Sequence, residues 1–217
     1  MTTFQKPIGV MGGSFDPIHF GHLRTATELV QIIDLQKILL IPCQAPVHKE
    51  RSFAAPQHRL AMIQLALADD SRIVASDQEL IRETPSYTIE TLTALRKTHP
   101  DVPLVLIMGS DAFVNIATWK NWHSIPDFAH IVVAVRAGQK MHLDSEIERF
   151  LKTRQTLDYG DLHETLAGKI FLQFVTPLDI SSTAIRCQLE AGYSPRYLLP
   201  DTVLAYIKTH HLYELLP

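Results

Sequence analysis

Short apolar runs that alternate with helix-patterned segments restrict the fold of this chain more than any other feature. The runs that read as strands cover residues 8–11, 37–41, 72–75, 103–108, 130–136 and 169–175. The segments with apolar residues at helical spacing cover residues 23–33, 56–68, 88–95, 112–122, 145–152, 181–189 and 200–210. Strands separated by helices favour one parallel sheet with right-handed crossovers. We therefore predict an α/β fold with a parallel sheet, helices on both faces and a C-terminal helical segment.

Composition and charge narrow the possible partners. The 217 residues are 46% hydrophobic and 20% charged, which suits a single globular domain. A formal net charge of −3 gives no overall attraction to nucleic acid, so any anion site must be built locally. No apolar run approaches the roughly 18 residues of a membrane span, and the first residues lack a secretory apolar segment. We expect a cytoplasmic protein with no nucleic-acid or membrane partner, whose Cys43 and Cys187 are reduced.

The segment after the first predicted strand carries unusual residues. Residues 12–22 read Gly-Gly-Ser-Phe-Asp-Pro-Ile-His-Phe-Gly-His, and paired glycines let a backbone turn sharply beside a ligand. His19 and His22 fall on one face of a helix that begins near His19. The first turn of a helix also offers unsatisfied N–H groups and the positive end of the helix dipole. Because parallel sheets bind ligands beyond the carboxyl ends of their strands, this turn is a candidate phosphate site.

The two histidines are also compatible with roles that involve no phosphate. The chain has neither the GxGxxG fingerprint nor a GxxxxGK[ST] loop, so neither of those phosphate-binding mechanisms is supported. His19 and His22 could be packing or surface residues. They could also be metal ligands, although no nearby Cys or third His completes a set. Their position after a strand and a glycine turn favours phosphate binding.

Two separated motifs resemble those of the HxGH nucleotidyltransferase superfamily. Residues 12–22 resemble its signature, and Ile180-Ser-Ser-Thr-Ala-Ile-Arg186 resembles its second motif, ISSTxIR. The resemblance implies a Rossmann-like fold in one nucleotidyltransferase domain over residues 1–217, with the second motif in a C-terminal helical segment at residues 180–217. It also implies transfer of a nucleotidyl group from a nucleoside triphosphate to a phosphate-bearing acceptor. The implied catalytic residues are His19, His22 and Arg186, and the implied phosphate ligands are Gly12, Gly13, Ser14, Phe15, Ser181 and Thr183.

Three further segments resemble bacterial nicotinate-nucleotide adenylyltransferases. They are residues 46–49, residues 85–88 with Thr91-Leu92, and residues 109–111 followed by Trp119. This resemblance implies ATP as donor, nicotinate mononucleotide as acceptor, and deamido-NAD (nicotinate adenine dinucleotide) with pyrophosphate as products. The implied acceptor ligands are His48, Tyr87, Thr88 and Trp119, and the implied ATP ligands include Lys49, Asp111 and Arg136. Trp119 would stack on the pyridine ring, and the helix start at Thr88 would receive the carboxylate.

Departures from the family pattern are few. Val47 and Ala137 stand where prolines are common, and Ser14 replaces a frequent threonine.

The cofactor and the oligomeric state are separate questions. We expect no metal ligands from the protein, because Mg2+ would be carried mainly by the triphosphate. A homo-oligomer is possible. Structural roles also remain open: helix capping for Ser181 and Thr88, core packing for Trp119. A different acceptor such as phosphopantetheine, CTP as donor, a non-catalytic ATP sensor and a zinc module are the alternative functions.

Overall fold

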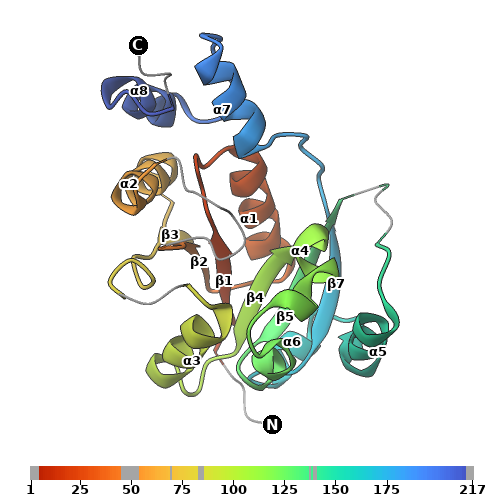
Figure 1. Cartoon of the computed structure of the whole chain (residues 1–217). Coiled ribbons are helices and arrows are strands. Elements are labelled where there is room, and N and C mark those ends of the chain that lie inside the picture. Colours follow the sequence, from red (N-terminus) through yellow and green to blue (C-terminus); the bar gives the residue numbers. More distant parts are fainter. Residues whose placement is uncertain are drawn as a thin grey trace.

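A seven-stranded parallel sheet forms the centre of the molecule (Figure 1). The computed structural model describes residues 5–44, 54–68, 70–82, 86–136, 138 and 141–213. The strand order is β3-β2-β1-β4-β5-β7-β6, so the order reverses between β1 and β4. The strands are β1 (Ile8–Gly13), β2 (Lys37–Pro42), β3 (Ile73–Ala75), β4 (Leu104–Gly109), β5 (His130–Arg136), β6 (Gln155–Thr156) and β7 (Ile170–Val175). The predicted α/β fold with a parallel sheet is confirmed, and the short edge strand β6 is an addition to it.

A helix lies between each strand and the next strand along the chain. The helices are α1 (Phe20–Ile32), α2 (Pro56–Leu67), α3 (Thr88–Thr98), α4 (Ser110–Val114), α5 (Ser145–Arg154), α6 (Asp161–Glu164), α7 (Ser182–Glu190) and α8 (Asp201–Thr209), with 3-10 turns η1 (Ile116–Thr118) and η2 (Trp122–Asp127). The helix predicted at residues 112–122 is therefore broken into short pieces. Trp119 adopts an extended backbone there, and Asn121 is left-handed at φ 50°. Such conformations interrupt a helix, and they leave Trp119 between two turns.

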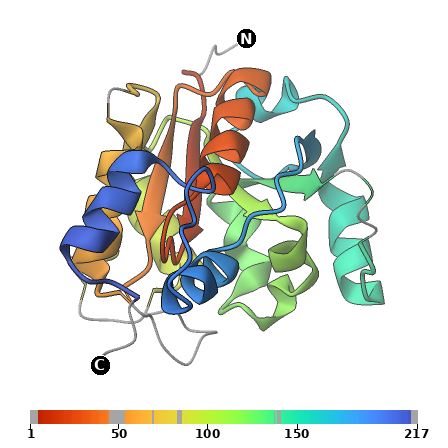
Figure 2. The same ribbon diagram turned by 90° about the horizontal axis from the view of Figure 1, so that it is seen from above.

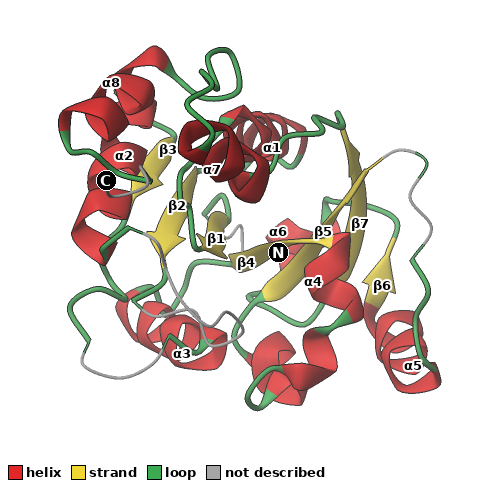
Figure 3. Ribbon diagram, turned by 45° about the horizontal axis from the view of Figure 1, so that its top comes forward, coloured by secondary structure: helices red, strands yellow, loops and turns green. Residues whose placement is uncertain are grey.

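Apolar residues cover both faces of the sheet, which explains why the strands read as continuous apolar runs. Along β2, Ile38 and Leu40 belong to one buried cluster, while Leu39 and Ile41 belong to the other. The first cluster packs beneath α1, α2, α7 and α8, and the second beneath α3, η1, η2 and α5. Figure 3 shows these two helical layers on opposite sides of the strands. Full burial of each such side chain contributes roughly 1.5–3 kcal/mol, so both layers are needed to hold the sheet.

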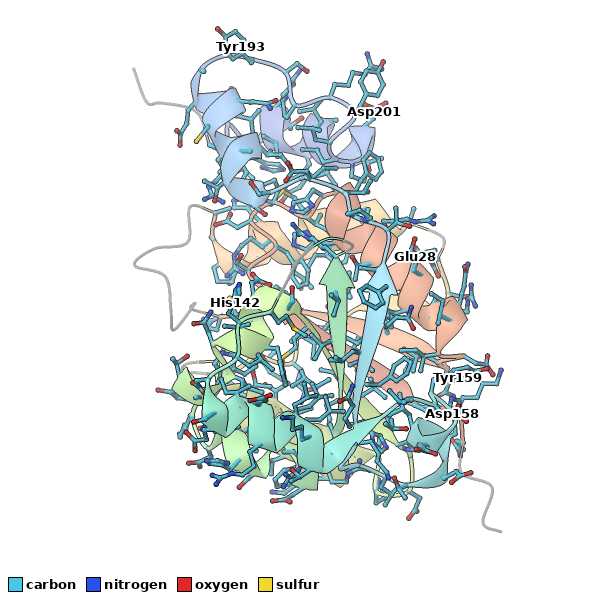
Figure 4. The ribbon with its side chains drawn as sticks, turned by 90° about the vertical axis from the view of Figure 1, so that its right-hand side faces the viewer. Glu28, His142, Asp158, Tyr159, Tyr193 and Asp201 are labelled. Carbon is cyan, nitrogen blue, oxygen red and sulfur yellow. The ribbon has the colours of Figure 1, made fainter. Side chains whose placement is uncertain are left out.

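The C-terminal helices lie beyond the carboxyl end of the sheet. Figure 1 shows α7 next to the start of α1, and Figure 2 shows α8 alongside α2, with which it is in contact. The Phe20 N–H donates to the Leu198 carbonyl at 3.0 Å, which joins the start of α1 to the segment before α8. In Figure 4 this region carries Tyr193 and Asp201, far from Asp158 and Tyr159 near α6. The second motif is thereby placed beside the first. Among the described residues, no helix has the length and apolar character needed to cross a membrane.

Candidate active site

One pocket of about 710 Å3 opens at the carboxyl ends of β1, β2, β4 and β5. Its position beside the reversal of strand order is the usual place for a ligand in a parallel sheet. Most of the residues predicted for the site line this pocket: Gly12, Gly13, Ser14, His19, His22, Tyr87, Thr88, Asp111, Trp119, Arg136, Ser181 and Thr183. Phe15 and Arg186 are buried outside this lining, and His48 and Lys49 lie outside the described residues. Individual roles of all these residues stay predictions.

The two histidines of the first motif stack at the start of α1. Their ring centroids are 3.7 Å apart with an interplanar angle of 25°, and His22 meets the edge of Phe15 at 5.0 Å. The His19 backbone N–H donates to Nδ1 of His22 over 3.3 Å. Because Nδ1 accepts that hydrogen bond, the neutral His22 ring carries its hydrogen on Nε2. His22 is therefore a hydrogen-bond donor at Nε2, which suits a phosphate oxygen.

His19 is held as a neutral ring. Its side chain is only 5% exposed, and burial together with the positive charge of Arg136 lowers its pKa from 6.5 to about 4. Among the described residues, its buried Nδ1 has no hydrogen-bond partner. An unpaired buried ring nitrogen is costly, so this atom is available to a ligand that can hydrogen-bond to it. Gly21 makes the ring position possible, since a Cβ there would lie 3.0 Å from the His19 ring.

Side chains from distant parts of the chain hold the turn that precedes His19. Asp16 is followed by a cis peptide bond to Pro17, and its buried carboxylate accepts from the Tyr213 hydroxyl at 2.7 Å and the Ala54 N–H at 3.2 Å. The Arg186 guanidinium donates to the Asp16 carbonyl at 2.6 Å and to the Thr183 hydroxyl at 3.3 Å. The Ser182 hydroxyl donates to the Pro17 carbonyl at 2.9 Å. The second motif thus binds the backbone of the first.

Arg59 joins two loops of the site, a structural role that the sequence did not predict. It lies on α2 with its side chain fully buried, and its guanidinium donates to the Ser14 carbonyl at 2.8 Å and the Cys43 carbonyl at 2.6 Å. It also donates to the carbonyls of Ala54 and Gln44. These bonds tie the loop after β1 to the loop after β2. The available signal was its spacing, because Arg59 precedes the buried Met62 and Ile63 by three and four residues on the same helical face.

A second helix start faces the pocket from α7. The Ser181 side chain caps this helix by accepting from the Ala184 N–H at 3.1 Å, so the expected capping role is present. Ser181, Ser182 and Thr183 all line the pocket. The connection to α7 is anchored by Glu28, labelled in Figure 4, which accepts from the Thr176 N–H at 2.8 Å and from Arg24 at 2.6 Å. Two helix N-termini therefore open onto one pocket, an arrangement that attracts anions.

The start of α3 and Trp119 form another part of the pocket wall. Tyr87, Thr88, Thr91 and Trp119 line it together with Lys120. The Lys120 ammonium lies 4.2 Å above the centre of the Tyr87 ring and pairs with Glu90, on α3, at 2.8 Å. These contacts hold the Trp119 segment beside the helix start. A half-buried indole beside the N-terminal turn of a helix can accommodate a flat ring that bears an anionic group.

Comparison with known proteins identifies the family. Residues 10–188 match the family model described as cytidylyltransferase-like. The protein named "Probable nicotinate-nucleotide adenylyltransferase" from Aeromonas salmonicida is 43% identical over 210 residues, which cover 97% of this chain and 98% of that protein. A protein of the same name from Acidithiobacillus ferrooxidans is 42% identical over 206 residues, or 94% of each chain. This chain belongs to the nicotinate-nucleotide adenylyltransferase family.

Solved structures support the same fold. The structure titled "Plasmodium falciparum nicotinic acid mononucleotide adenylyltransferase complexed with NaAD" superposes with a TM-score of 0.73 at 20% identity, covering 96% of this chain and 98% of that one. The complex of the same protein with APC gives a TM-score of 0.71 at 19% identity. At such identities the likeness speaks for the fold alone. The predicted family membership and the Rossmann-like fold are thereby confirmed.

Proposed function

We propose that this chain transfers the adenylyl group of ATP to nicotinate mononucleotide, giving deamido-NAD and pyrophosphate. The observation that carries the proposal is that one pocket joins the His19–His22 pair, two helix N-termini and the Trp119 wall. The histidine pair and the helix N-termini suit phosphates, and the Trp119 wall suits an aromatic acceptor with an anionic substituent. Membership of the family supports the same reaction.

The chemistry proposed for the site is a direct in-line displacement. An oxygen of the acceptor phosphate attacks the α-phosphorus of ATP, the bond from that phosphorus to the bridging oxygen breaks, and pyrophosphate leaves with that oxygen. The acceptor phosphate is already an anion at neutral pH, so the protein does not need to remove a proton. Positioning and stabilisation of phosphate charge are then its main tasks.

The residues of the first motif would supply hydrogen bonds rather than positive charge. His19, with its pKa lowered to about 4, is neutral at pH 7, and His22 donates from Nε2. Arg136, exposed at the end of β5, lies close enough to His19 to depress its pKa and supplies a positive charge on that side. The N–H groups at the starts of α1 and α7 would add fixed partial charges around the triphosphate.

The protein side chains do not form a dedicated metal site in the described part of the chain. No group of three or more His, Cys, Asp or Glu residues there could hold a metal ion. Mg2+ usually keeps several waters and binds through the phosphates of its nucleotide. We therefore propose that Mg2+ arrives with ATP and neutralises phosphate charge, while the residues named above orient the two nucleotides.

A panel of acceptors tests the substrate assignment. Pyrophosphate release from ATP is measured with nicotinate mononucleotide, nicotinamide mononucleotide and phosphopantetheine, and products are identified by mass spectrometry. We expect the highest kcat/KM with nicotinate mononucleotide, because the start of α3 favours a carboxylate over an amide. Equal turnover of the acid and the amide would refute the acceptor assignment. His22→Ala should lose at least about 100-fold in kcat, since a positioned donor to the reacting phosphate is worth that much.

The direct mechanism has its own test. Incubation with ATP labelled on the α-phosphate, followed by denaturation, should leave no label on the protein. A labelled protein that transfers its adenylyl group to the acceptor would establish a covalent intermediate and exclude direct attack. If ATP binds but no acceptor gives pyrophosphate with either the wild type or His22→Ala, the chain is a nucleotide sensor.

A further inference from the structure

Glu79 is a buried acid in the pocket that takes no part in the proposed displacement. It follows β3, its side chain is 7% exposed, and it lines the pocket together with Cys43 and Thr91. A buried carboxylate in a pocket that receives anions is unfavourable unless it accepts hydrogen bonds from neutral groups. Burial raises the pKa of the neighbouring Cys43 thiol, so this thiol is neutral at pH 7 and adds no charge beside Glu79.

One oxygen of this carboxylate is used within the protein. Oε1 accepts from the hydroxyl of Thr91, on α3, at 2.6 Å, and Thr91 is only 2% exposed. Arg82 donates to the same hydroxyl oxygen at 3.3 Å. The single Thr91 hydrogen goes to Glu79 at 2.6 Å rather than to the more distant Tyr87 carbonyl at 3.5 Å. Among the described residues, no hydrogen bond to the other oxygen, Oε2, is formed. Glu79 therefore presents a fixed acceptor to the pocket.

The position of Glu79 selects the part of the ligand that it can meet. Thr91 lies one helical turn beyond Thr88, so Glu79 belongs to the wall formed by α3 and Trp119, where the acceptor nucleotide is proposed to bind. The carboxylate and the phosphate of that nucleotide would be repelled by Glu79. The ribose between them carries neutral hydroxyl groups, each of which can donate one hydrogen bond.

We propose that Glu79 is a specificity-determining residue that accepts a hydrogen bond from a ribose hydroxyl of the acceptor nucleotide. This inference rests on the proposed function. It predicts that the enzyme discriminates against acceptors that lack the hydroxyl, because Oε2 would then lack its donor in the occupied pocket. It also predicts rejection of acceptors with a phosphate on the ribose, because two anions would face each other.

The test compares ribose and deoxyribose acceptors on the same protein preparation. For the wild type, kcat/KM with nicotinate mononucleotide should exceed that with its 2′-deoxy or its 3′-deoxy analogue by about 10- to 100-fold, the range expected for a hydrogen bond to a charged group. Glu79→Gln keeps one oxygen for Thr91 and places an amide NH2 where Oε2 stood. This variant should reduce the preference at least about fivefold while leaving the KM for ATP within about twofold. The ratio is independent of the folded fraction.

Thr91→Val is the matched control, because it removes the hydroxyl that binds Glu79 but keeps the carboxylate. Because the carboxylate is still present but less firmly held, Thr91→Val should reduce the ribose preference less than Glu79→Gln does, even where its overall rate falls. If Glu79→Gln lowers kcat/KM equally for ribose and deoxyribose acceptors, or if the wild type shows no ribose preference, the assignment of Glu79 is wrong. If the wild type does not use nicotinate mononucleotide at all, the proposed function fails and this inference fails with it.

Discussion

Gly21→Ala tests whether the geometry of the histidine pair determines the rate. Gly21 is the second residue of α1, and a Cβ added there would lie 3.0 Å from both Cε1 and Nδ1 of His19. The carbonyl oxygen of Ile180 would be 3.6 Å away, which is ordinary van der Waals contact. The His19 ring must therefore move by a few tenths of an ångström. It stacks on His22 at 3.7 Å, so the movement disturbs both rings.

Gly21→Ala should lower kcat while it changes the free energy of unfolding little. Gly21 is not among the glycines with positive φ, so alanine fits the helical backbone, and its higher helix propensity contributes up to about 1 kcal/mol. The tight contact with His19 offsets part of that gain, and the free energy of unfolding should change by less than about 1 kcal/mol. A misplacement of 1 Å can cost about 100-fold in rate, so a shift of a few tenths of an ångström should lower kcat roughly 3- to 10-fold.

The assay is pyrophosphate release at saturating ATP and nicotinate mononucleotide, combined with urea unfolding of the same preparation. Gly160→Ala is the matched control: its Cβ would meet Asp158 Oδ1 at 3.1 Å, and Gly160 precedes α6, away from the pocket. That variant should keep the wild-type kcat. An unchanged kcat in Gly21→Ala, or equal losses of kcat in both variants, would refute the link between the histidine geometry and the rate.

Three further perturbations probe the framework around the site. Tyr213→Phe removes the donor 2.7 Å from the buried Asp16 carboxylate and should lower the free energy of unfolding by about 2 kcal/mol; an unchanged urea midpoint would contradict this. Burial lowers the pKa of His19 and of His130 from 6.5 to about 4, so the unfolded chain binds protons that the folded chain excludes between these values. Stability should therefore fall as the pH drops from 6.5 to 4, by up to about 3 kcal/mol for each ring, and a urea midpoint that is constant from pH 7 to pH 5 would exclude this effect. Arg59→Lys leaves an ammonium that cannot span the carbonyls of both loops. The variant should lose about 3 kcal/mol of the free energy of unfolding, and its kcat should fall as well. Equal stability to the wild type in urea would show that these hydrogen bonds do not stabilise the fold.

The parts of the site that the sequence predicted depend on local signals. The strand, the glycine turn and the start of α1 follow one another within residues 8–22, and the capping of α7 by Ser181 is equally local. The apolar pattern also predicted the parallel sheet, because strands buried on both faces must be apolar throughout. Such features need no knowledge of distant contacts.

The remaining features depend on contacts between distant residues. The Tyr213 hydroxyl reaches Asp16 across 197 positions of the sequence, and no spacing rule connects them. In α2, Leu60, Ile63 and Leu67 are apolar at helical spacing. The buried residues are nevertheless Arg59, Met62 and Ile63. An arginine within an amphipathic helix is normally exposed. Arg59 is buried because four backbone carbonyls surround its guanidinium, which is a tertiary property.

Arg186 has a predicted role in phosphate binding and an observed role in holding the turn before His19. Its motif predicts a phosphate ligand, which stays a prediction, while the structure shows that its guanidinium donates to the Asp16 carbonyl at 2.6 Å. Asp16 lies three residues before His19, so removal of Arg186 would loosen the turn that sets the histidine pair. A loss of activity in Arg186→Ala would therefore combine a lost phosphate contact with a displaced His19. Measuring the pKa of His19 by NMR in the variant without nucleotide separates the two, because only loosening of the turn would expose that ring and raise its pKa from about 4 toward 6.5.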